Sequence, residues 1–183
     1  NLSNSSGETV ALQISPNIGT LSVVTDNGNG TYSAQLSSTV TSGSVTITGS
    51  INGTPMSNNA TVDFLAGAAS TVNTTITVAT PTLVADGSST TVITVKTFDI
   101  NNNPLTVSDS SISLGTSAGT ISSIIYDGAG QYSATLTAPT TVEQATITGL
   151  IGLQTIIDNA TVSFVSGSAD HTESTITSSL ESI

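Results

Sequence analysis

The sequence predicts an all-β protein of tandem Greek-key β-sandwiches, with about seven short strands in each repeat of roughly 100 residues. Three observations support this prediction: a composition rich in β-branched and small polar residues, short runs of alternating apolar and polar residues, and an internal repeat. The chain has 183 residues and a positive mean hydropathy of +0.24, so it has the length and the apolar content for a buried core.

The charge composition excludes several kinds of partner and site. The chain has a single lysine, no arginine, twelve acidic residues and a formal net charge of −11. A field this negative repels phosphate groups, so we expect neither nucleic acid nor an anionic membrane surface as a partner. No apolar run approaches the roughly 20 residues of a membrane-spanning helix, and we expect no membrane insertion. The absence of cysteine rules out disulfides and thiolate metal sites.

The internal repeat gives the domain organisation. Shifting the sequence by 100 residues aligns it with itself without gaps, and 25 of the 59 positions in 19–77 are identical to their partners. The segment GNGTYSAQL (28–36), for example, falls on GAGQYSATL (128–136). A period of this length is too long for a solenoid and matches a small domain, so the sequence predicts tandem domains.

Alternation within each copy predicts the strands and the core. The residues expected to face inward are Tyr32, Ala34, Leu36 and Phe64 in the first copy and Ile112, Leu114, Tyr132, Ala134, Leu136, Ile147, Val162 and Phe164 in the second. TDNGNG (25–30) and YDGAG (126–130) predict hairpin turns, because Asp, Asn and Gly tolerate the positive φ that such turns need. No segment has the periodicity and caps of a helix.

One ordered set of motifs resembles a known family. VADGSSTTVITVKTFDINNNP (84–104), GTIS (119–122), GAGQYSATL and ATVSF (160–164) are similar to a bacterial Ig-like domain of group 1, the invasin/intimin type of tandem repeat in surface adhesins. The resemblance covers roughly 70–167 and the later part of the other copy. Asn102 stands where the family usually has glycine. Asparagine tolerates a left-handed backbone, so we expect the turn to persist.

The resemblance implies an Ig-like sandwich that serves as a stalk or array module of an extracellular, cell-surface adhesin. It supplies no catalytic residues. On this interpretation the chain is a non-enzymatic structural protein in cell adhesion, and its partners are neighbouring Ig-like repeats.

The repeat register predicts three segments of unequal completeness. Residues 1–67 form an incomplete Ig-like repeat that lacks its first strands, and 68–167 form a complete one. Residues 168–183 are the first strand of a further repeat, or a donor strand. Two hypotheses follow. In one the chain is a piece of a longer array. In the other it is a fibre subunit whose C-terminal strand completes the open N-terminal sandwich of the next subunit, which gives a head-to-tail homopolymer.

Metal and catalytic motifs are sparse. DINNNP (99–104) resembles the opening of an EF-hand loop, but Pro104 stands at the required glycine, so that motif is rejected. Asp86, Asp99, Asp170 and Glu173 are candidates for a looser Ca²⁺ site, the one cofactor considered. The competing interpretation is that Asp and Asn cap turns through their own backbone.

No set of residues supports catalysis or cofactor binding. GTSAG (115–119) matches the nucleophile-elbow pattern, but no helix is expected after Ser117, and the only histidine is His171 in the junction. Lys96, the one lysine, alternates with inward-facing residues and is expected on the outer face of its strand. We therefore expect no enzyme activity.

Overall fold

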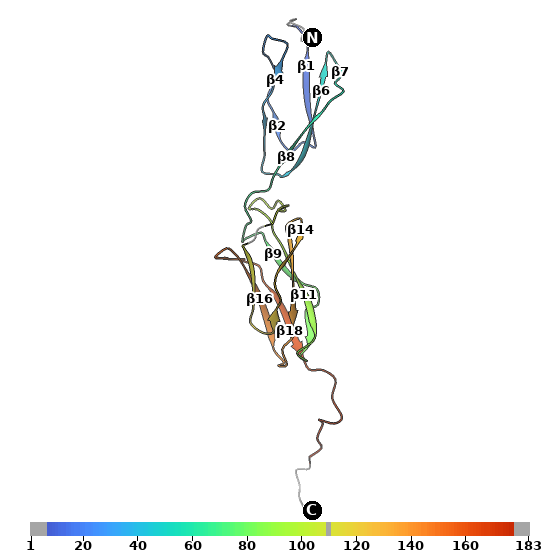
Figure 1. Ribbon diagram of the computed structural model, residues 1–183, viewed down its shortest axis with the longest axis vertical. Helices are drawn as coiled ribbons and strands as arrows, with labels where there is room; N and C mark the ends of the chain where they lie inside the picture. The colour runs from blue at the N-terminus through green and yellow to red at the C-terminus, as the bar shows by residue number, and fades with distance from the viewer. Residues whose placement is uncertain (1–6, 109–110, 178–183) are drawn as a thin grey trace, which may run out of the picture.

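The computed structural model describes residues 7–108 and 111–177, and every regular element in this part of the chain is a β-strand. The strands form two groups, at 10–64 and 75–165, which share no sheet among the described residues. The two groups are stacked end to end along the long axis of the molecule (Figure 1). No helix long and apolar enough to cross a bilayer occurs between residues 7 and 177, with 109–110 left aside.

The strand bounds are as follows. The first group contains β1 (Val10–Ser15), β2 (Thr20–Leu21), β3 (Thr25–Asp26), β4 (Tyr32–Ser33), β5 (Leu36–Ser37), β6 (Gly43–Ile51), β7 (Thr54–Pro55) and β8 (Ala60–Phe64). The second contains β9 (Thr75–Val78), β10 (Thr82–Val84), β11 (Thr90–Lys96), β12 (Ile112–Thr116), β13 (Thr120–Ile121), β14 (Ile125–Gly128), β15 (Gln131–Thr137), β16 (Gln144–Ile151), β17 (Gln154–Thr155) and β18 (Ala160–Val165).

The second group closes into a two-sheet sandwich. One sheet has the order β10–β18–β16–β12 with β17 on β16, and the other has the order β13–β15–β11–β9 with β14 on β15. All pairs are antiparallel except β10 with β18, which is parallel. The connections from β11 to β12 and from β15 to β16 pass between the sheets, as in a Greek key. The predicted all-β sandwich is confirmed.

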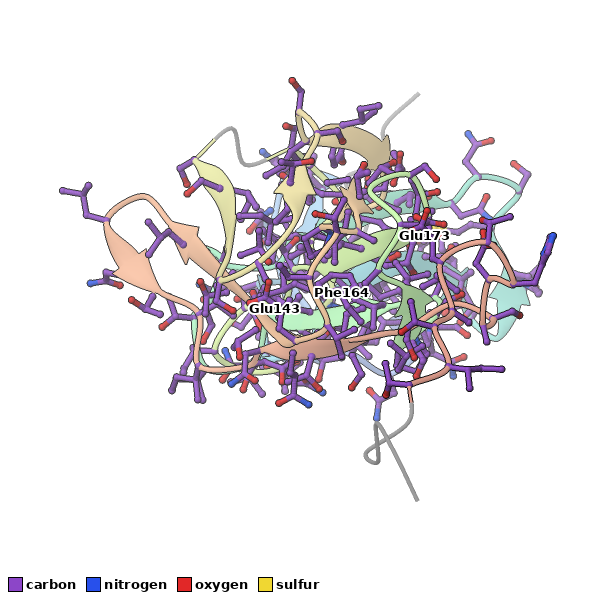
Figure 2. All side chains as sticks on the ribbon, turned by 90° about the horizontal axis from the view of Figure 1, so that it is seen from below. Glu143, Phe164 and Glu173 are labelled. Atoms are coloured by element: carbon purple, nitrogen blue, oxygen red, sulfur yellow. The ribbon has the colours of Figure 1, made fainter. Side chains whose placement is uncertain are left out.

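The residues that alternation predicts to face inward lie in the core of the second sandwich, together with others such as Ile76, Leu83 and Ile156. Tyr132, Ala134, Leu136, Ile147, Val162 and Phe164 are each at most 4% exposed, and Ile112 is 9% exposed. Leu114 is partly buried against the same cluster. Viewed from the C-terminal end, Phe164 lies inside the projected outline of the sandwich (Figure 2). The expected positive φ values also occur, at Gly128, Gly130 and Asn102.

The first group of strands leaves its apolar face partly uncovered. Its members are a sheet of β1, β6, β7 and β8 and two short pairs, β2 with β5 and β3 with β4. Phe64 is only half-buried, whereas its repeat partner Phe164 is 1% exposed. Met56 is 40% exposed, against 2% for its partner Ile156.

Absent strand neighbours explain this difference. In the second sandwich β11 pairs with β15 along its whole length, and β9 and β10 flank the two sheets. No counterpart of β9, β10 or β11 lies among the described residues of the first group. The prediction that Tyr32 and Phe64 occupy matched core positions therefore holds for their orientation, but both side chains remain half-buried.

The matched phenylalanines give a test of this difference in closure. We expect Phe164→Ala to destabilise the second sandwich by about 3–5 kcal/mol, the usual cost of removing a buried ring. Phe64→Ala should cost clearly less, because water already reaches its ring. Denaturant unfolding followed through amide NMR signals of each sandwich measures both effects. Equal destabilisation by the two substitutions would contradict the open first sandwich.

Candidate interdomain interface

The turn at 99–103 follows β11 at the end of the second sandwich that faces the first. Thr97 is buried, and both its backbone N–H and its hydroxyl donate to the carbonyl oxygen of Gly130, at 3.0 and 2.8 Å. The N–H of Leu105 returns to the carbonyl oxygen of Thr97 at 3.0 Å. Gly130 has φ +68°, and a Cβ there would lie 2.3 Å from the carbonyl oxygen of Leu105. Close backbone packing therefore fixes the base of the turn.

Asp99 holds the turn from inside. Its Oδ1 accepts the backbone N–H groups of Asn101 and Asn103, at 2.9 and 2.8 Å. The backbone N–H of Asp99 donates to the carbonyl oxygen of Asn103 at 2.9 Å, and Asn102 adopts φ +65°. Asp99 is only 2% exposed although it carries a carboxylate. A buried carboxylate with several N–H donors is a strongly held arrangement.

Two side chains of this turn reach the first sandwich. Oδ2 of Asp99 accepts the N–H of Gly67 at 2.9 Å. Nδ2 of Asn103 donates to the carbonyl oxygen of Val40 at 2.6 Å, and Oδ1 of Asn103 accepts the N–H of Ser42 at 2.9 Å. The second hydrogen of Nδ2 goes to Oδ2 of Asp99 at 2.8 Å. We call these five residues, Val40, Ser42, Gly67, Asp99 and Asn103, the interdomain clamp.

The linker between the sandwiches adds further contacts to the same turn. Ala69 forms an isolated antiparallel bridge with Asp99, and the N–H of Ser70 donates to the carbonyl oxygen of Phe98 at 2.8 Å. Nδ2 of Asn73 donates to the backbone carbonyl oxygen of Asp99 at 2.8 Å. The linker is therefore hydrogen-bonded along the edge of the turn.

Apolar packing contributes little at this junction. Val40, Leu65, Val72 and Ile100 stay between 57% and 75% exposed, and hollows of about 500 and 550 Å³ adjoin the clamp. Hydrophobic stabilisation scales with the apolar area removed from water, and little is removed here. Hydrogen bonds across the junction are therefore the main interactions that fix the orientation of one sandwich relative to the other.

The pKa of Asp99 reflects this environment. The side chain of Asn103 is the largest cause that lowers it, the N–H groups of Gly67, Asn103 and Asn101 lower it further, and burial opposes them. The net effect lowers the pKa of Asp99 from 3.8 to about 2. The clamp thus contains an ionised carboxylate at every pH well above that value.

Two of the other calcium candidates, Asp86 and Asp170, also accept hydrogen bonds in turns. Asp86 accepts the N–H groups of Ser88 and Ser89, which lower its pKa well below the usual range. Asp170 accepts the hydroxyl and the N–H of Thr172, and its pKa is lowered for the same reason. No group of three or more acidic or histidine side chains that could hold a metal occurs in 7–108 and 111–177. Glu173 is exposed in the tail, and a calcium site stays a hypothesis.

The residues considered for catalysis are not brought together. Oγ of Ser117 accepts the N–H of Thr146 at 2.9 Å, in a loop that leads from β12 into the short strand β13. His171 is 97% exposed, and its Nδ1 lies 3.8 Å from a carboxylate oxygen of the adjacent Asp170. Lys96 is exposed on β11, as its alternation predicts.

The interdomain role of Asp99 and Asn103 is not evident in the sequence. Both residues look like ordinary turn-forming residues, and the given sequence holds no position 100 residues before Asp99 with which to compare it. Their partners across the junction are backbone groups of Val40, Ser42 and Gly67, and a backbone group requires no particular side chain at its position. Only the three-dimensional arrangement reveals the contact.

Comparison with known families identifies a match over most of the chain. The family model described as invasin, domain 3, matches residues 1–67 and again 70–167. These two matched segments meet at the linker that carries the interdomain contacts. No curated protein matches the sequence.

Solved structures of bacterial adhesins are similar to the chain. FdeC, an Escherichia coli adhesin, has a TM-score of 0.72 and 28% identity over 92% of this chain and 55% of its own. Invasin, described as a bacterial integrin-binding protein, has a TM-score of 0.62 and 27% identity over 88% of this chain and 33% of its own. InvD of Yersinia pseudotuberculosis, at 24% identity and a TM-score of 0.72, supports the fold over 94% of this chain and 51% of its own. The chain spans about half of FdeC and InvD and a third of invasin.

Removing the amide of Asn103 should loosen the junction. Asn103→Ala deletes two interdomain hydrogen bonds of about 1 kcal/mol each, so the undocked population should rise on the order of tenfold or more. ¹⁵N relaxation, which reports whether the two sandwiches tumble together, measures the change. Asn101→Ala is the matched control, because the turn uses only the backbone of Asn101. Unchanged common tumbling of Asn103→Ala would contradict the clamp.

The junction should also open in acid. Because the pKa of Asp99 is lowered in the folded chain, the stabilisation of the junction by its carboxylate is full above the unfolded value of 3.8 and is lost as the pH falls toward 2. Hydrogen exchange at the Gly67 amide, corrected for its intrinsic rate, should show protection from pH 7 to 5 and its loss near pH 2. Asp99→Asn cannot titrate and should remove this dependence. A protection that stays constant to pH 2 would be inconsistent with a role for the Asp99 carboxylate.

Proposed function

The chain belongs to the family of invasin domain 3, and from this premise we propose that it is a non-enzymatic stalk segment of an extracellular, cell-surface adhesin. The observation that carries the proposal is the interdomain clamp, in which the side chains of Asp99 and Asn103 join two sandwiches end to end by hydrogen bonds with backbone groups of the first. The similarity to FdeC and invasin, at 28% and 27% identity, supports the same role.

A stalk must hold its distal end away from the surface, so its domains need a preferred direction relative to one another. The clamp supplies that direction, because its bonds converge on backbone groups of the first sandwich from one turn of the second. Backbone groups have fixed positions, so the turn can satisfy all of them in only one orientation. On this proposal the partners are neighbouring Ig-like repeats in the same chain.

The surface composition suits an array of such segments. The net charge of −11 keeps neighbouring stalks apart by repulsion, and neutral serine and threonine side chains cover much of the strand surface. The chain offers one lysine and no arginine, so charge-mediated lateral contacts between copies are disfavoured.

A second candidate function is a self-assembling filament subunit. The observation that favours it is the open first sandwich, where Met56 and Val62 are 40% and 37% exposed on a face that is covered in the second. A strand donated by the C-terminal tail of another copy would cover this face and form a head-to-tail homopolymer.

The pairing order of the second sandwich restricts how such donation could work. The tail corresponds by the repeat to β9, which pairs with β11 and not with β15. The first sandwich has no described counterpart of β11, so a tail in the β9 place would find no strand to pair with. The donated tail would have to occupy the β11 place, or the β10 place beside β8, and its last six residues, 178–183, lie outside the described residues.

Sedimentation velocity over a wide concentration range separates the two functions. The stalk proposal expects a monomer at all concentrations, with the high frictional ratio of two sandwiches placed end to end. The filament function expects polymers that grow with concentration and disappear when 168–183 are deleted. Monomers with the frictional ratio of a compact sphere would contradict both.

A further inference from the structure

We propose that the far end of the second sandwich is a second clamp surface, made by the backbone groups of Thr140, Val142 and Gly167. The partner that it fits is a further Ig-like sandwich, joined through the tail and carrying an Asp-x-x-x-Asn turn like 99–103. This inference rests on the proposed stalk function and names the partner and the contact atoms at a surface that the first junction does not use.

The repeat register gives each backbone partner of the first clamp a counterpart at the far end of the second sandwich. Val40, Ser42 and Gly67 correspond, without gaps, to Thr140, Val142 and Gly167. The first clamp uses only one carbonyl oxygen and two N–H groups of these residues. The changes from valine to threonine and from serine to valine therefore leave every required group in place. Neither donor position is proline, so both N–H groups are present.

These groups are available at the end of the second sandwich. Thr140, Val142 and Gly167 are all exposed. Among residues 7–108 and 111–177, no group donates to the carbonyl oxygen of Thr140, and the N–H groups of Val142 and Gly167 have no acceptor. Figure 2 is a view onto this end of the molecule, with Glu143 and Glu173 both labelled on it.

The tail supplies an independent observation. In the linker of the first junction the N–H of Thr74 donates to the carbonyl oxygen of Ser70 at 3.0 Å, and the side chain of Ser70 accepts the N–H two positions on. In the tail the N–H of Ser174 donates to the carbonyl oxygen of Asp170, also at 3.0 Å, and the side chain of Asp170 accepts the N–H two positions on. The tail thus forms the same turn as the linker of the first junction, although no further sandwich is packed on it.

One substitution distinguishes the two junctions. Asn73 donates its Nδ2–H to the carbonyl oxygen of Asp99 at 2.8 Å, and its counterpart in the tail is Glu173. An ionised carboxylate has no hydrogen to donate, and its charge would face a carbonyl oxygen. Ala69, which bridges to Asp99, has the identical counterpart Ala169. The second junction should therefore form in the same geometry as the first but hold less strongly.

An extended chain tests the proposal. Residues 84–167 are added after Ile183, so that 168–183 take the place that 68–83 have in the second sandwich. We expect hydrogen exchange at the Val142 and Gly167 amides to slow about tenfold or more relative to the unextended chain, as for donors held by polar side chains. Alanine in place of the added copy of Asp99 should return the Gly167 amide to its original rate.

Two glutamate variants of the extended chain test the role of position 173. Glu173→Asn restores the donor and should slow exchange at Gly167 further, several-fold. Glu143→Asn is the matched control, since it removes one charge from the same end of the sandwich but lies outside the tail. An equal effect of the two substitutions would mean that net charge, and not a hydrogen bond, sets the strength of the junction.

A folded third sandwich with unchanged exchange at Val142 and Gly167 would overturn the proposal. If the added segment does not fold, a second chain, 1–167 followed by 68–183, repeats the second sandwich whole with its own linker and Asn73. Unprotected amides in that chain would also overturn the inference. Exchange at Ser42 and Gly67 in the unextended chain reports the first clamp separately, so loss of protection there would count against the proposed stalk function instead.

Discussion

The antiparallel pairing of β11 with β15 is the interaction on which the rest of the molecule depends. It covers the core of the second sandwich, where Ile93 and Val95 are fully buried. It also determines where β11 ends, and the turn that carries Asp99 begins three residues after Lys96. The same strand thus closes one sandwich and positions the side chains that hold the other. The first sandwich lacks a described counterpart of this strand, which is why its apolar face stays partly open.

Orientation at the junction comes from polar groups and not from apolar area. A hydrophobic contact of the size seen here would be non-directional and would allow the sandwiches to roll against each other. The hydrogen bonds that one carboxylate and one carboxamide make with three fixed backbone groups are satisfied together in a single geometry. The cost of burying Asp99 is offset because its two oxygens accept four N–H groups. A chain nearly devoid of basic residues thus stabilises a buried acid without an ion pair.

Periodicity of the sequence was enough to predict the sandwich, its turns and its core, because each depends on side-chain type at regular spacing. Ile147 and Phe164 alternate with threonine and serine, and both are buried. The half-exposure of Phe64 could be anticipated only in part, from the repeat register, in which β9 to β11 have no counterpart in the described part of the first group. The clamp could not be predicted, because Asp99 and Asn103 bond to backbone groups whose positions depend on how two folded units meet. Their residue types suit an isolated turn equally well.

One feature of the second sandwich bears on how it responds to tension. The chain enters this sandwich at the end that faces the first and leaves it at the opposite end (Figure 1). β10 follows the first strand, β9, and lies parallel to the last strand, β18, with Leu83 beside Phe164. Pulling the ends apart slides the two strands past each other, so their hydrogen bonds resist in shear, all at once. An antiparallel pair of terminal strands would instead be peeled open one bond at a time.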